Sequence, residues 1–98
     1  MSLIPYRIFY NWGNGDRQVF LDDLTETGHF SEKDVNDFVE STEAIIVYWV
    51  ENWPFMITYY NNLCHLEIQN QSWSEPLTSL NRLEDRLSDW LKNENYTF

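Results

Sequence analysis

Residues 22–53 read DDLTETGHFSEKDVNDFVESTEAIIVYWVENW, and the fold depends on how this stretch is interpreted. Its first part is strongly acidic, with Lys33 opposed by eight carboxylates: Asp22, Asp23, Glu26, Glu32, Asp34, Asp37, Glu40 and Glu43. Its second part, residues 44–50, is apolar and aromatic. Apolar or small residues recur at steps of three and four, the spacing of one buried helix face, at Val35, Phe38, Val39, Thr42, Ile45, Ile46, Trp49, Val50 and Trp53.

The same stretch carries signals for where a helix begins and ends. Ser31 with Asp34 three residues later resembles a capping box, and Pro54 would stop a helix. Because no Gly, Pro or Asn separates Thr42 from Ile46, the pattern predicts one long helix of roughly five to six turns. The alternative is a helix to about Thr42 followed by a β-strand, since residues 45–50 are rich in strand formers.

The N-terminal segment suggests a β-hairpin. Residues 4–11 are dense in Tyr, Ile and Phe and predict a strand. Residues 12–16 contain two glycines and an Asn, which favour a turn, and residues 17–21 are expected to return as a second strand. Residues 25–31 then form a connector that contains Gly28.

A second hairpin is indicated by two strand-like segments, 55–60 and 63–68, around Asn61-Asn62. Two Asn residues suit a two-residue turn with positive φ angles. Closing the hairpin there puts three pairs on one core face: Tyr59 with Cys64, Ile57 with Leu66, and Phe55 with Ile68. The opposite face carries a mixed set, namely Met56, Thr58, Tyr60, Leu63, His65 and Glu67.

The C-terminal third predicts a polar linker and a last helix. Residues 69–74 form the linker around Trp73, and residues 74–76 open the helix with a Ser cap and a Pro in the first turn. Its buried stripe would be Leu77, Leu80, Leu83, Leu87, Trp90 and Leu91. Residues 93–98 are expected to fray unless Tyr96 or Phe98 docks. Among the tryptophans, the predicted core members are Trp49, Trp53 and Trp90, and the exposed ones Trp12 and Trp73.

These elements predict a single α+β domain over residues 1–98. The expected order is ββαββα, with two hairpins on one antiparallel sheet and both helices on one of its faces. A chain of 98 residues has no room for a second core.

Charge and cysteine content restrict the possible partners. A net charge of −10 repels nucleic acid and anionic membranes, so the expected partner is a basic protein and the chain a monomer or weak dimer. The single Cys64 excludes an internal disulfide and any Cys-based zinc site. No signal peptide and no apolar run of roughly 18 residues is present, which predicts a cytoplasmic location.

Catalytic and metal chemistry find little support in the sequence. Cys64 and His65 are neighbours on a predicted strand, so their side chains point to opposite faces and cannot form a dyad. Asp22, Asp23, Glu26 and His29 form a loose oxygen-rich group that lacks the ligand order of a calcium loop. We therefore expect no catalytic residue, metal or cofactor.

The acidic run is the most informative functional feature. Bases at i,i+4 usually accompany a solvated helix face, and here they are almost absent, although a plain solvated face is the alternative. The expected partner-binding residues are Asp22, Asp23, Glu26, Asp34, Asp37, Glu40, Glu43, Tyr48 and Trp12.

The predicted function is that of a small acidic inhibitor, of the immunity type, which occupies the cationic surface of a basic nucleic-acid-acting protein such as a nuclease toxin. One alternative is a phage-type DNA mimic directed at a restriction or CRISPR system. Such a mimic would spread its charge over a long surface, because duplex DNA presents one charge per about 1.7 Å. The other alternative is an adaptor module whose acidity serves only solubility.

Overall fold

The computed structural model describes residues 7–51 and 53–94. These residues form an α+β fold with a five-stranded antiparallel sheet in the order β1-β2-β3-β4-β5 and three α-helices. The elements are β1 (Arg7–Asn11), α1 (Arg17–Glu26), α2 (Glu32–Ser41), β2 (Ala44–Val50), β3 (Trp53–Tyr60), β4 (Leu63–Ile68), β5 (Gln71–Pro76) and α3 (Leu80–Asn93), with 3-10 turns at Trp12–Asn14 and Leu77–Ser79. The predictions for residues 4–6, Tyr96 and Phe98 lie outside the described residues.

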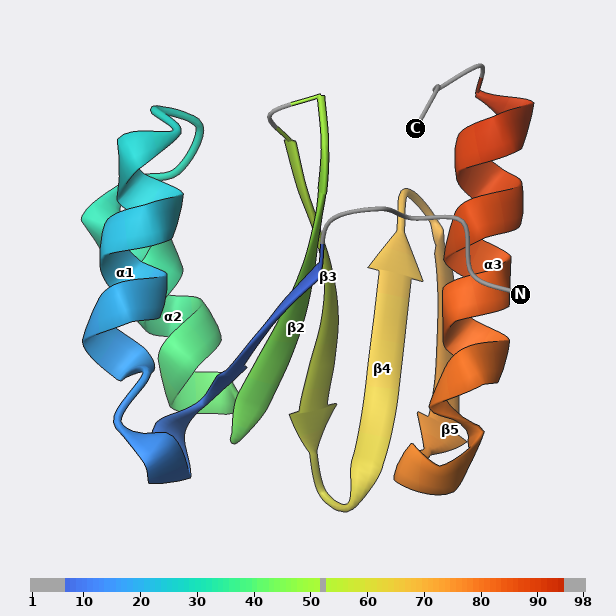
Figure 1. Cartoon of the computed structure of the whole chain (residues 1–98), viewed down its shortest axis with the longest axis horizontal. Coiled ribbons are helices and arrows are strands. Elements are labelled where there is room, and N and C mark those ends of the chain that lie inside the picture. Colours follow the sequence, from blue (N-terminus) through green and yellow to red (C-terminus); the bar gives the residue numbers. More distant parts are fainter. Residues whose placement is uncertain (1–6, 52, 95–98) are drawn as a thin grey trace.

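The helices cover both faces of the sheet. Figure 1 shows α1 and α2 together on one side and α3 on the other. Each side has its own apolar cluster. One is built from Tyr10, Phe20, Leu24, Val35, Val39, Ile45 and Val47, and the other from Ile46, Tyr48, Val50, Ile57, Cys64, Leu66, Ile68, Leu83, Leu87 and Leu91. The expectation of a ββαββα order with both helices on one face was therefore wrong.

The long helix predicted from residue 32 past Tyr48 is also wrong. Helix α2 ends at Ser41, and residues 44–50 form the strand β2, as in the alternative interpretation. Because β2 lies between the two helical layers, Ile45 packs toward α1 and α2 while Ile46 packs toward α3. A strand buried on both faces reads as a continuous apolar run. The capping box is confirmed, since Ser31 and Asp34 exchange side-chain to backbone hydrogen bonds of 3.1 and 3.2 Å.

The first predicted hairpin does not form, because residues 17–21 belong to α1. Phe20 and Leu24 are four residues apart, the spacing of one helix face, and both are fully buried beside Tyr10. Strand β1 pairs instead with β2, in a register that places Tyr10 opposite Ile45.

The second hairpin forms at the predicted turn but is shorter than predicted. Asn61 and Asn62 have φ angles of 54° and 63°, and Tyr59 pairs with Cys64 and Ile57 with Leu66. The predicted pair of Phe55 with Ile68 is wrong, because the β3–β4 register ends at Ile57 and Leu66. Beyond that point β3 stays with β2, while the end of β4 pairs with β5. Figure 1 shows β3 and β4 close at their turn and far apart at their other ends.

The predicted linker at residues 69–74 is largely the edge strand β5, and α3 begins at Leu80 rather than at the Ser74-Pro76 segment. The predicted stripe of α3 is buried at Leu83, Leu87 and Leu91, whereas Leu77 precedes the helix and is exposed. None of the helices in residues 7–51 and 53–94 is long and apolar enough to cross a membrane.

Candidate functional site

Exposed carboxylates gather on the helix pair α1 and α2, which lie side by side in Figure 1. Residues 16–43, which make up this layer, contain nine carboxylates and two bases, and so carry seven of the ten net negative charges. We call the exposed members the acidic helix surface: Asp22, Glu26, Glu32, Asp34, Asp37, Glu40 and Glu43. Most of the acidic residues that the sequence predicted to bind a partner therefore lie exposed on one layer of the structure.

Few of these carboxylates are paired. Lys33 donates to Asp37 at 3.1 Å, and this hydrogen bond and charge raise the pKa of Lys33. Asp34 is engaged in the capping box, and Asp22 accepts a hydrogen bond from Gln18 at 2.9 Å. Within the described part of the chain, Glu26, Glu40 and Glu43 form no side-chain hydrogen bond or ion pair. Their charge is available to a partner.

The placement of Glu26 and Glu40 is unfavourable for the helices themselves. Each lies in the last turn of its helix, and neither α1 nor α2 has a basic residue there. The negative end of the helix dipole disfavours an acid at this position, by typically 0.3–1 kcal/mol. Helix α3 ends in the opposite way, with Lys92 in its last turn.

Three predicted binding residues have their polar groups engaged inside the protein. Tyr48 was expected to lie in the long helix and to contact the partner, but it is fully buried in β2, and its hydroxyl donates to Glu84 at 2.7 Å. Trp12 is half-buried, and its Nε1 donates to the Thr42 carbonyl at 2.9 Å. Asp23 is half-buried and accepts from the Tyr10 hydroxyl at 2.7 Å.

A groove lies beside the acidic helix surface. The core residues of α1 and α2 pack against β1 and β2, so the same face of the sheet stays open over β3, β4 and β5. The groove has a volume of about 810 Å³. Phe38 and Ser41 of α2 form one wall, while Thr58, Tyr60, His65 and Ser74 lie on the strands of the floor. It continues through the opening between β3 and β4.

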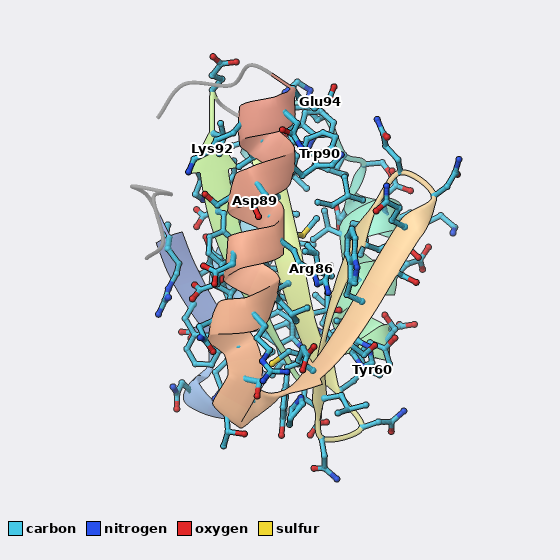
Figure 2. All side chains as sticks on the ribbon, turned by 90° about the vertical axis from the view of Figure 1, so that its right-hand side faces the viewer. Tyr60, Arg86, Asp89, Trp90, Lys92 and Glu94 are labelled. Carbon is cyan, nitrogen blue, oxygen red and sulfur yellow. The ribbon has the colours of Figure 1, made fainter. Side chains whose placement is uncertain are left out.

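The opening between the strands leads toward α3. Trp73 and Trp90, which belong to the α3 side of the sheet, also line the groove. Figure 2 shows Arg86 and Trp90 on the same side of α3, the side toward β5. Arg86 lies over the ring of Trp73, with 5.3 Å between its guanidinium carbon and the ring centroid.

Aromatic side chains form the mouth of the groove. The ring of Trp53 lies 4.7 Å from that of His29 and 5.7 Å from that of Phe30, and Phe30 in turn contacts Phe38 at 6.0 Å. Trp53 was predicted to be a core residue but is 41% exposed. The sequence carried one signal for this position, the following Pro54, which breaks a helix and so detaches Trp53 from the predicted buried stripe.

His65 is fixed on the groove floor. Its Nδ1 lies 2.8 Å from Ser74 Oγ and its Nε2 lies 3.2 Å from the Tyr60 carbonyl oxygen, while the Tyr60 ring stacks on the imidazole at 4.0 Å. Since a carbonyl oxygen only accepts, the tautomer that satisfies both contacts has its proton on Nε2 and accepts from Ser74. A hydroxyl and an imidazole in this geometry could act as nucleophile and base.

Acyl transfer needs more than that pair. It requires hydrogen-bond donors aimed at the developing oxyanion. Glu67, two residues beyond His65 and so on the same strand face, presents a carboxylate that would repel one. We therefore treat Ser74 and His65 as a rigid polar floor. Cys64 faces the other way, as predicted, and its burial raises the pKa of the thiol.

Metal chemistry has no assembled site in the described residues, where no group of three or more His, Cys, Asp or Glu side chains could hold an ion. His29, which belongs to the loose oxygen-rich group identified in the sequence, packs on Trp53 instead.

No protein-family model, curated protein or solved structure matches this chain. The chemistry of the acidic helix surface and of the groove is therefore the guide to function.

Proposed function

We propose that this protein is a small acidic inhibitor of the immunity type, which neutralises a basic nucleic-acid-acting protein by covering its cationic surface with the acidic helix surface. The observation that carries the proposal is the set of carboxylates in the last helical turns, Glu26 and Glu40, without any compensating base. A cationic partner would supply the missing opposite charge.

The cost of this arrangement argues against a merely solvated surface. Solubility needs net charge but does not need acids at the ends of helices where the dipole disfavours them. The charge is also unevenly distributed. Outside residues 16–43 the chain has seven carboxylates and four bases, so the remainder of the molecule is much closer to balance. Concentration of charge in one layer is what directed encounter with an oppositely charged partner requires.

The size of the surface supports a compact interface rather than an imitation of a DNA duplex. Helices α1 and α2 have ten residues each, which corresponds to about 15 Å of length. A stretch of duplex DNA of that length carries about nine charges, spaced regularly on both strands. The acidic helix surface is less dense and lies beside an aromatic groove, which suits one specific protein partner.

The test begins with capture of the partner from the host and its purification. Association rates are then measured at low and high salt for a double variant, Glu26→Lys with Glu40→Lys. Opposite charge speeds encounter, so the rate should fall by about tenfold or more at low salt, and the partner's action on nucleic acid should be restored.

The matched control is Asp85→Lys with Asp89→Lys, two exposed acids on α3. This variant changes the net charge equally and should leave association nearly unchanged. Equal rates for both double variants, or a captured partner without a cationic surface, would overturn the proposal.

A further inference from the structure

The groove differs from the rest of the surface in its charge. No Lys or Arg is among the described residues that line it, and Glu67 is its one acidic member. More carboxylates stand along the α2 wall. Asp34 and Asp37 each precede a lining residue, Phe38 and Ser41, by four positions, and residues four apart share one side of a helix. Negative charge therefore borders the groove along its α2 wall and lies on its floor at Glu67.

The mouth of the groove offers aromatic rings to a cation. Trp53 is exposed, its ring contacts that of Phe30, and Phe30 in turn contacts Phe38. Indole faces attract guanidinium and ammonium groups, and the aliphatic stems of Arg and Lys cover apolar surface well. Arg86 on Trp73 shows the same pairing within this molecule.

The shape of the groove suits an extended chain. It runs between helix α2 and the strands β3 to β5, and several of its lining residues, such as Ser41, Glu67 and Ser72, are exposed. Hydroxyl groups of Thr58, Ser72 and Ser74 lie along the floor. Those of Thr58 and Ser74 donate to His65 and can accept from a peptide N–H, while that of Ser72 can donate or accept.

We propose that the groove binds an extended basic segment of the partner, with Arg or Lys stems on Trp53 and head groups directed to Asp34 and Glu67. This inference rests on the proposed function, because the segment belongs to the same basic partner. It adds a second contact area, in which apolar and cation–π contacts slow dissociation while the acidic helix surface speeds encounter.

The experiment uses a defined probe, so that it does not depend on identifying the partner. The probe is a capped peptide of about nine residues that alternates Arg and Val, with an extended length of about 30 Å. That length compares with molecular extents of 32 × 30 × 24 Å. Amide chemical shifts of the whole 98-residue chain locate the site, and calorimetry gives the affinity. A peptide that alternates Glu and Val is the charge control.

Two substitutions remove groove contacts and one fills the groove. Trp53→Ala and Glu67→Gln should each weaken binding of the Arg-Val peptide by about fivefold or more, and Ser72→Tyr by about tenfold or more. The matched controls are Phe9→Ala, another exposed aromatic residue, and Asp89→Asn on α3. Both control variants should bind the Arg-Val peptide with an affinity within about twofold of that of the wild type. Thermal melting verifies that each variant folds, and Ser72→Tyr, on an exposed edge-strand position, serves if Trp53→Ala unfolds.

The outcomes separate this inference from the proposed function. Shift changes confined to the acidic helix surface, or equal binding of the Glu-Val peptide, would overturn the groove assignment. Self-association through groove residues, seen by sedimentation, would also overturn it, because the occupant would then be a second copy. If the natural partner binds the Ser72→Tyr variant as well as the wild type, but does not bind the variant with Glu26→Lys and Glu40→Lys, the inference fails and the proposed function stands.

Discussion

At the scale of the residue, the interior carboxylate of Glu84 connects distant parts of the fold. Its Oε2 accepts from the Tyr48 hydroxyl of β2 and from Arg7 Nη1 of β1, each at 2.7 Å. Glu84 itself belongs to α3 and is 7% exposed. A buried carboxylate is stabilised only by such donors, so removal of one partner is more costly than the bond alone is worth.

The first prediction concerns Tyr48→Phe. At neutral pH the variant should lose about 1–3 kcal/mol of unfolding free energy, because Glu84 stays buried with one donor fewer. Burial, and then the hydrogen bond and charge of Glu84, raise the pKa of Tyr48 above its ordinary value of 10.0. Above about pH 10 the unfolded chain therefore releases a proton that the folded chain retains, and stability falls by about 1.4 kcal/mol per pH unit.

Urea unfolding from neutral to strongly alkaline pH measures both effects. The Tyr48→Phe variant should show a shallower alkaline decline than the wild type, because it lacks this group. The other tyrosines and Cys64 are common to both proteins and cancel in the comparison. Identical alkaline slopes would show that Tyr48 ionises in the folded state as readily as in the unfolded one.

A second prediction concerns Ser88, which is 3% exposed in α3 and whose Oγ has no hydrogen-bond partner among the described residues. An unsatisfied buried hydroxyl is unfavourable, and Ala has the higher helix propensity. Ser88→Ala should therefore raise the unfolding free energy by about 0.5–1 kcal/mol, measured by urea titration. A loss of stability would reveal a partner for Oγ such as a buried water.

At the scale of the element, the sequence predicted those features that neighbouring residues determine. The turn at Asn61-Asn62 and the cap at Ser31 depend on side chains within three residues, and both were confirmed. Residues 44–50 could not be assigned in this way. An apolar run satisfies the helical spacing and the strand composition alike, and the choice depends on the strands and helices that cover it from both sides.

In the candidate site, too, one part could be predicted from neighbouring residues and the other part could not. The acidic helix surface was predictable, because charged side chains in a long polar run remain exposed in almost any fold. The groove was not, because it is made by the divergence of β3 from β4 and by α2, which are brought together only by the sheet order. Tyr48 is buried and Trp53 is exposed, each the opposite of its prediction, because residues 44–50 form a strand between two helical layers and not the end of a long helix.

The third prediction tests the hairpin turn. Asn62 has a φ of 63°, a conformation that Gly adopts without penalty, and Asn-Gly is the preferred pair for a turn of this kind. Asn62→Gly should raise the unfolding free energy by about 0.5–1 kcal/mol, while Asn62→Val should lower it by at least about 1 kcal/mol. Urea titration of the two variants checks this, and equal effects would mean that the turn does not hold this geometry in solution.

At the scale of the whole molecule, most of the net negative charge lies in the α1–α2 layer, while acids and bases are closer to equal in number in the rest of the protein. The α1–α2 layer holds seven of the ten net charges, whereas α3 places Arg82 and Arg86 close in sequence to Asp85 and Asp89. Self-repulsion within the layer destabilises the compact state and weakens as salt is added, since the screening length is about 10 Å at 0.1 M. The fold should therefore become more stable with increasing salt.

The last prediction follows from that separation. Neutralising Glu26→Gln with Glu40→Gln removes two acids from unfavourable helix ends, so the unfolding free energy at low salt should rise by up to about 1 kcal/mol and the gain should shrink at high salt. The same change on α3, Asp85→Asn with Asp89→Asn, removes acids that have bases close in sequence and should give no gain. Urea titrations at two salt concentrations measure the unfolding free energy of both variants.

If Glu26 and Glu40 contact the partner, the stabilised variant must also associate with it more slowly, because selection would otherwise have no reason to keep acids that weaken the fold. A variant that is more stable and associates at the wild-type rate would contradict the functional role of these two carboxylates.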